Sequence, residues 1–103
     1  MNLWEIAKQA NTLEDEAWFD LDAVMHKFTQ EVGELNDAIQ KYRWIYSKTK
    51  YDTLDEVHDE ASDVIFNFIS MLNRLGVDVN EIESMAESTL NKFIERRKLY
   101  SDK

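Results

Sequence analysis

The sequence predicts an all-α protein, and three observations support this fold class. The 103 residues contain no proline and only two glycines, Gly33 and Gly76, so few positions interrupt a helix. Apolar residues recur in steps of three and four along most of the chain. The length fits one small domain spanning residues 1–103, whose core cannot bury all of its apolar surface. We therefore expect a four-helix bundle that assembles into a homodimer or homotetramer.

Two helices are predicted before residue 43. A short amphipathic helix covers residues 3–10, and Asn11 or Thr12 caps a long second helix. The apolar stripe of this second helix consists of Ala17, Leu21, Val24, Phe28, Val32, Leu35, Ile39 and Tyr42. The following residues, 43–52, mix aromatic and cationic side chains without periodicity and are interpreted as a loop. Such a loop either covers a nucleotide base or packs over the core or a partner subunit.

Two more helices are predicted after residue 52, each with its own start or stop signals. Thr53 to Glu56 resembles a capping box, and Gly76 is placed to end the third helix. The apolar face of this helix consists of Val57, Ala61, Val64, Ile65, Phe68, Leu72 and Leu75. Asp78, with Glu81 three residues later, can begin the last helix. We expect its inward side chains to be Ile82, Met85, Ala86, Thr89, Phe93 and Ile94.

Composition excludes several classes of function. The formal net charge of −9 argues against binding to a nucleic-acid backbone, which requires a basic surface. The absence of cysteine excludes thiol catalysis and cysteine-ligated metals. No apolar run is long enough to cross a bilayer, and the N-terminus lacks the order of a signal peptide. We expect a cytoplasmic protein that contacts neither nucleic acid nor membrane.

Two pairs of acidic residues form the strongest candidate site. Glu31 with Glu34 and Glu60 with Asp63 are spaced three residues apart, so each pair lies on one side of its helix and borders an apolar stripe. If the stripes face each other, four carboxylates converge in a set of oxygen ligands that suits Mg²⁺ or Mn²⁺. The competing interpretation is a solvated acidic face, because 21 of the 103 residues are acidic.

Three basic residues and one asparagine are further candidates for the same site. Lys27 lies one turn before Glu31 on the same side of the helix, while Lys92 and Arg96 share a face of the last helix. Asn67 lies one turn after Asp63 and either contacts a sugar or base or makes a hydrogen bond between helices. Neither His26 nor His58 is preceded three residues earlier by glutamate, so a diiron carboxylate site is not indicated.

The acidic pairs and their surroundings also resemble a known family. Gln30-Glu31-Val32-Gly33-Glu34-Leu35 and Asp59-Glu60-Ala61-Ser62-Asp63-Val64-Ile65-Phe66 resemble the two-part signature of the MazG-like all-α nucleoside triphosphate pyrophosphohydrolases. The segment Asn91-Lys92-Phe93-Ile94-Glu95-Arg96 resembles the C-terminal helix motif of that family. The resemblance runs from about Trp18 to Arg97 and departs at Gln30, where the family usually has glutamate.

The resemblance implies an activity and roles for the residues. It implies hydrolysis of a (deoxy)nucleoside triphosphate to the monophosphate and pyrophosphate with Mg²⁺ as cofactor, a reaction that serves to remove non-canonical nucleotides. Metal binding and catalysis would fall to the four carboxylates, and Lys27, Lys92 and Arg96 would approach the phosphates. The sequence does not assign the general base. A specialised dUTP or phosphoribosyl-ATP hydrolase of the same superfamily and a non-enzymatic helical interaction module remain as alternatives.

Overall fold

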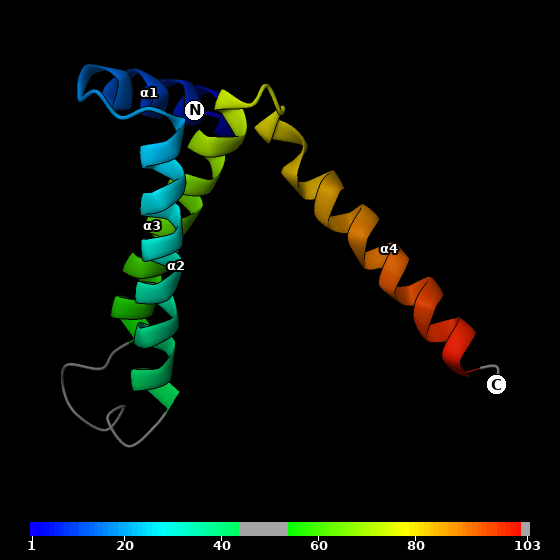
Figure 1. Cartoon of the computed structure of the whole chain (residues 1–103). Coiled ribbons are helices and arrows are strands. Elements are labelled where there is room, and N and C mark those ends of the chain that lie inside the picture. Colours follow the sequence, from blue (N-terminus) through cyan, green and yellow to red (C-terminus); the bar gives the residue numbers. More distant parts are fainter. Residues whose placement is uncertain (44–53, 102–103) are drawn as a thin grey trace.

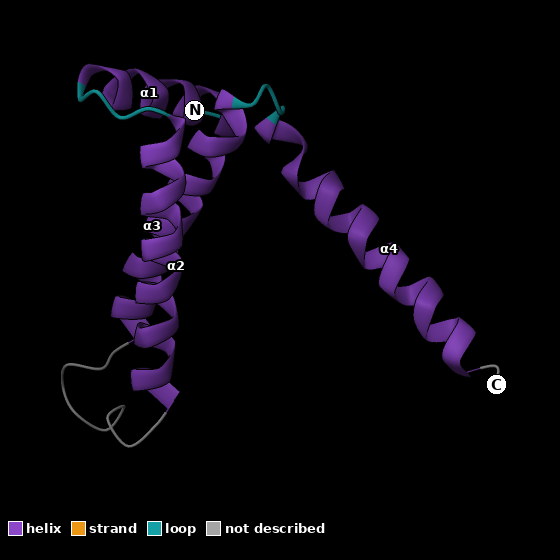
Figure 2. Cartoon of the chain, in the orientation of Figure 1, coloured by secondary structure: helices purple, strands orange, loops and turns teal. Residues whose placement is uncertain are grey.

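Four α-helices make up the chain in the computed structural model, which describes residues 1–43 and 54–101. The helices are α1 (Leu3–Glu16), α2 (Leu21–Arg43), α3 (Leu54–Arg74) and α4 (Ile82–Ser101), with the 3₁₀ turn η2 (Val79–Glu81) before α4. No strand occurs in these two ranges, which confirms the all-α class (Figure 2). Most of the predicted loop at 43–52 lies outside the described residues, while Arg43 ends α2.

The first helix is longer than predicted. Asn2 caps α1 by accepting a hydrogen bond from the Glu5 amide at 2.8 Å, and the Glu5 carboxylate reaches back to the Asn2 amide. Asn11 and Thr12, expected to begin a new helix, lie inside α1 instead. The reason is that the Asn11 side chain donates to Ser70 on α3, and the Thr12 hydroxyl donates to the carbonyl of Lys8.

The chain turns between α1 and α2 at residues 17–20. Trp18 has a φ of 63°, a left-handed conformation that ends α1 and carries strain for a residue other than glycine. Asp20 then accepts a hydrogen bond from the Ala23 amide at 2.9 Å and so caps α2. The apolar stripe predicted for the second helix is buried only in part. Val24 is buried, Val32 and Tyr42 are exposed, and Ala17 lies before α2 and is also exposed.

The predicted end of the third helix is confirmed. Gly76 has a φ of 82°, and its amide donates to the carbonyl of Asn73, while the Val77 amide donates to the carbonyl of Leu72. These two bonds satisfy carbonyls at the helix end that would otherwise lack partners. Asp78 next accepts from the Asn80 amide at 3.0 Å, which starts η2 and leads the chain into α4.

Helices α2 and α3 run antiparallel along their length, and α1 lies across one end of the pair (Figure 1). Phe28 on α2 and Phe68 on α3 meet with ring centroids 5.9 Å apart. The core beneath α1 is formed by Ala7, Ile69 and Val79, which are all but inaccessible to solvent. Within the described ranges, α1, α2 and α3 thus form a three-helix body, and η2 packs against α1 and α3 at its end.

The buried face of α3 is rotated from the predicted one. Ile65 and Leu75 were expected in the core but are mostly exposed. Asn67 and Ser70 are buried in their place, because α3 packs against α1 as well as against α2 and has to present a second face. A polar side chain is tolerated there since its hydrogen bonds are satisfied.

An ion-pair network fastens α1 to the end of α3. The Arg74 guanidinium lies 3.1 Å from Glu14 and 3.0 Å from Asp15, and it also donates to the backbone carbonyl of Asn11. Glu14 is only 12% exposed, whereas Asp15 is 67% exposed. Removal of the cation would therefore leave the Glu14 carboxylate desolvated and unpaired, which is costly.

Substitution of Arg74 by methionine is expected to destabilise the fold by about 2–3 kcal/mol, because Glu14 keeps its burial but loses its counterion. Urea denaturation followed by circular dichroism measures the free energy of unfolding. The control is Asp15→Asn, which removes an exposed partner of the same arginine and should cost less than about 1 kcal/mol. If both variants lost the same free energy of unfolding, the burial of Glu14 would not explain the effect of Arg74.

The last helix departs from the predicted bundle. Helix α4 leaves the three-helix body, and within residues 1–43 and 54–101 it approaches no other long helix (Figure 1). Ile82 at its start packs against the core, but no residue of α4 is buried. The expectation that the apolar side chains of α4 face a core of the same chain is therefore wrong beyond Ile82, because the helix axis points away from that core.

Among the described residues, every helix lacks either the length or the apolar character needed to span a bilayer.

Candidate metal centre

Helices α2 and α3 bring acidic side chains together midway along their contact. Glu31 on α2 and Glu60 and Asp63 on α3 each offer a carboxylate oxygen, and these three atoms all lie within 4.8 Å of one another. Because α2 and α3 pack side by side, residues spaced three apart on each helix face the same gap. The structure thus joins both halves of the acidic pattern seen in the sequence.

The cluster is electrostatically unfavourable without a cation. Burial is the main cause that raises the pKa of Glu31 and of Glu60 above 4.5, and the charges of Glu34 and Asp63 add to it for both residues. Lys27 acts in the opposite direction on Glu31. Glu34 therefore lies close enough to influence both carboxylates, although it is exposed and stands outside the group of three.

Two oxygens in the cluster are buried and lack hydrogen-bond partners among the described residues. They are Oε2 of Glu31 and Oε2 of Glu60, one from each helix. A buried carboxylate oxygen without a donor is costly, and a bound cation removes that cost. Carboxylate oxygens are also the ligands that Mg²⁺ and Mn²⁺ prefer, so the residues present fit a hard divalent cation.

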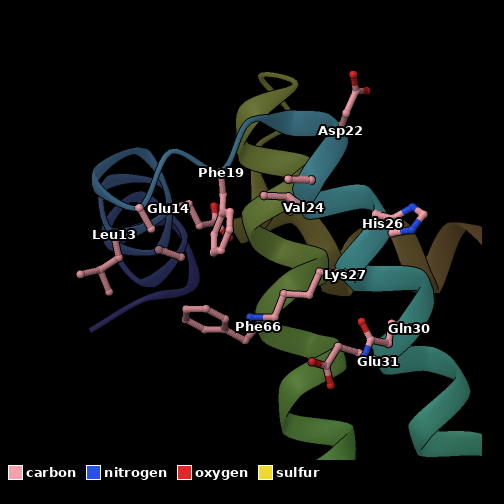
Figure 3. Close-up of a pocket in the computed structure, with 13 residues that line it drawn as sticks. Leu13, Glu14, Phe19, Asp22, Val24, His26, Lys27, Gln30, Glu31 and Phe66 are labelled. Atoms are coloured by element: carbon pink, nitrogen blue, oxygen red, sulfur yellow. The ribbon is translucent and has the colours of Figure 1, made fainter.

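The other predicted site residues are not all near the cluster. Lys27 lies beside Glu31 (Figure 3). Asn67 is only 2% exposed, and its amide donates to the backbone carbonyl of Asp63 within the same helix at 3.0 Å. Lys92 and Arg96 are carried away from the carboxylates by α4 (Figure 1). The structure therefore gathers five of the eight predicted residues, places Asn67 one turn from Asp63, and leaves only Lys92 and Arg96 apart.

A cavity of about 750 Å³ opens beside the cluster. It lies between the end of α1, the first half of α2 and Phe66 of α3, and Glu31 and Lys27 line it (Figure 3). The sequence did not reveal this cavity, because it depends on how α1 and α2 are placed in space and on Phe66 from α3. The signal available was the run of aromatic residues at 18–19, which the prediction treated as part of a helix.

The fold is all-α, and carboxylates from α2 and α3 gather at one place along the contact between these helices. The chain matches the MazG nucleotide pyrophosphohydrolase domain over residues 23–100, and it belongs to this family. Searches among curated proteins and among solved structures gave no match. Membership implies a nucleotide substrate, and the acidic cluster of α2 and α3 falls within the matched residues.

Addition of Mn²⁺ or Mg²⁺ is expected to raise the melting temperature, because an ion that binds only the native state stabilises it. Circular dichroism melting with millimolar metal and with EDTA measures the shift. Glu60→Gln should abolish most of it. Asp59→Asn, which removes the same charge from the exposed neighbouring position, should preserve it. An unchanged melting temperature in the wild type would argue against the centre.

The raised pKa of Glu31 and Glu60 also predicts how stability depends on pH. The folded state favours their neutral forms, so this stabilisation is complete below about 4.5 and is lost as the pH rises through the folded-state pKa. In EDTA, the melting temperature should fall over that range. The fall should be smaller in Glu60→Gln but not in Glu83→Gln, an exposed position on α4. If the melting temperature fell with pH equally in the two variants, the raised pKa of Glu60 would not be the cause.

Proposed function

We propose that the protein is a Mg²⁺-dependent pyrophosphohydrolase that converts (deoxy)nucleoside triphosphates to monophosphates and pyrophosphate. The observation that carries the proposal is the cluster of Glu31, Glu60 and Asp63, in which two buried oxygens lack hydrogen-bond donors among the described residues. Family membership supports the reaction class. Mn²⁺ is the alternative ion, since the same oxygen ligands serve both.

The chain's own residues supply binding, positioning and proton transfer. A bound divalent cation neutralises phosphate charge and makes water more acidic. Glu31, Glu60 and Asp63 would hold the ion between α2 and α3, with Glu34 as a further ligand. Lys27, which already acts on Glu31, extends from α2 toward the cavity and would contact a phosphate (Figure 3). The phosphate chain would then lie over the gap between the two helices.

Proton transfer would fall to a carboxylate of the cluster. Glu31 is one candidate, because it belongs to the cluster and also lines the cavity. Glu34 is the other candidate, because it lies close to both raised carboxylates and is exposed to water. Either residue would take the proton of the attacking water while the pyrophosphate departs.

The exposed apolar face of α4 supports assembly into a dimer or tetramer. Leu90, Phe93 and Ile94 are about half exposed and lie on a helix that no other long helix of the described chain covers. Apolar surface of this extent is stable in water when a second copy buries it. The Arg96 guanidinium lies 5.5 Å from the Phe93 ring on the same helix, so a partner that covers Phe93 also contacts Arg96.

Because α4 leaves the body of its own chain, Lys92 and Arg96 would act at the carboxylate cluster of a second subunit. They lie far from the cluster of their own chain. In an assembly that buries α4, the two cations would reach the cluster of the partner subunit, where they would stabilise the charge on the departing pyrophosphate. Each site would then consist of carboxylates from one chain and cations from another.

Glu60→Gln and Asp63→Asn are expected to reduce pyrophosphate release by at least about a thousandfold, because loss of a ligand removes the metal from the reaction. Helical content should be unchanged. Asp59→Asn is the matched control and should retain most of the activity, since it changes the same charge at an exposed position. A coupled pyrophosphate assay measures the rates. Turnover that survives in either cluster variant would refute the proposed site.

Complementation tests whether the cations act between chains. Lys92→Ala should weaken substrate binding and raise KM. Assayed well below the raised KM, co-expressed Lys92→Ala and Glu60→Gln should recover up to about a quarter of wild-type activity, because about half of the dimers are mixed and half of their sites are intact. Glu60→Gln with Asp63→Asn is the control and should not recover, since both defects lie in one cluster. Failure of the first pair to recover would refute the contribution between subunits.

The oligomeric state is tested separately. Phe93→Glu places a charge in the exposed apolar face of α4 and should shift the protein toward the monomer in sedimentation velocity. Glu95→Lys, an exposed change on the same helix, should leave the sedimentation coefficient unchanged. A wild-type protein that sediments as a monomer would contradict the assembly.

A further inference from the structure

The cavity beside the cluster is continuous with the site proposed for the phosphates. Glu31 belongs to both, since it lines the cavity and offers an oxygen to the group of three. Lys27 stands at the same end, while Glu14 and Phe19 lie at the other end and Phe66 reaches in from α3 (Figure 3). A nucleotide whose phosphates lie at the cluster would therefore extend its sugar and base into the cavity.

The walls of the cavity suit a planar ring. Phe19 and Phe66 are both partly exposed although they are large and apolar, so each offers part of its ring to a ligand. Leu13 and Val24 add aliphatic surface. Aromatic side chains bind nucleobases by stacking, and this contact does not depend on which base is present. Selection among bases has to come from a polar group at the far end.

Glu14 is that polar group, and its neighbours hold it in one orientation. Arg74 donates to its Oε1 at 3.1 and 3.2 Å, and Ser70 and Asn11 donate to the same atom. Every hydrogen bond that the described residues make to this carboxylate goes to Oε1. The side chain also lines the cavity. The second oxygen, Oε2, is thus available as an acceptor whose position is fixed.

We infer that the cavity binds the base of the substrate and that Glu14 selects bases that carry an exocyclic amino group. This inference rests on the proposed function for the location of the phosphates. An ionised carboxylate accepts hydrogen bonds and donates none. The amino group of cytosine, adenine or guanine can donate to Oε2, whereas the carbonyl oxygen that uracil or thymine presents at the position of the cytosine amino group would be repelled. The Arg74 guanidinium, 3.1 Å from Glu14, pairs with this carboxylate beside the apolar wall of the cavity.

The test compares 2′-deoxycytidine with 2′-deoxyuridine, which differ at this edge of the base. NMR titration of the full-length protein in EDTA follows the ring resonances of Phe19 and Phe66. Deoxycytidine should bind at least about tenfold more tightly, as expected for a hydrogen bond to a charged group. Deoxyadenosine and deoxyguanosine show whether a purine binds better than the pyrimidine. Equal affinity for deoxycytidine and deoxyuridine would overturn the inference.

Glu14→Gln gives the sharper result. Its carbonyl oxygen can keep the bonds from Arg74 and Ser70, while its amide places a donor where Oε2 stood. The preference should reverse toward deoxyuridine, whereas a purely structural role would weaken both nucleosides alike and so refute the assignment. Glu16→Gln, an exposed change on the same helix, should leave the preference unchanged. If Glu14→Gln does not fold, the wild-type comparison still decides.

The nucleoside experiment is independent of hydrolysis. Nucleosides carry no phosphate and need no metal, so their discrimination can be found even if no pyrophosphate is released from any triphosphate. In that case the proposed function fails and the base pocket stands. Release of pyrophosphate without discrimination between dCTP and dUTP, together with equal nucleoside binding, would overturn the base pocket alone.

Discussion

The mutual repulsion of carboxylates held between α2 and α3 is the constraint on which the rest of the structure depends. The packing of the two helices, with Phe28 against Phe68, forces Glu31 toward Glu60 and Asp63. Desolvation and the neighbouring negative charges both disfavour the ionised carboxylates, and they raise the pKa of Glu31 and of Glu60. The apolar contact between the two helices therefore supplies the energy that holds these carboxylates together.

Helix α1 contributes to the core and also lines the cavity beside the carboxylates. Its Ala7 packs with Ile69 and Val79, and the ion pair between Glu14 and Arg74 fixes its far end to α3. Because that end stands off from α2, a cavity remains between them, with the carboxylates at one side. The network thus has two consequences: it stabilises the protomer, and it orients a carboxylate toward the space where a base would lie.

The fourth helix shows a different balance of forces. After the Gly76 turn the chain returns to the core at Val79, and only beyond Ile82 does α4 leave the three-helix body with its apolar residues exposed. A helix of this kind gains stability when it packs on another chain, so assembly would stabilise α4. The basic residues Lys92 and Arg96 lie on this same helix, so assembly and completion of the site would be one event.

The sequence by itself determined the all-α class, the helix end at Gly76 and the acidic pairs of α2 and α3, because periodicity, caps and spacing along one helix are local properties. Only the tertiary structure decided the rest. Asn11 joins Ser70 instead of capping a helix, Asn67 is buried, and the cavity walls come from three helices. These features depend on contacts between residues about sixty positions apart or on the direction of a helix axis, which local patterns do not encode.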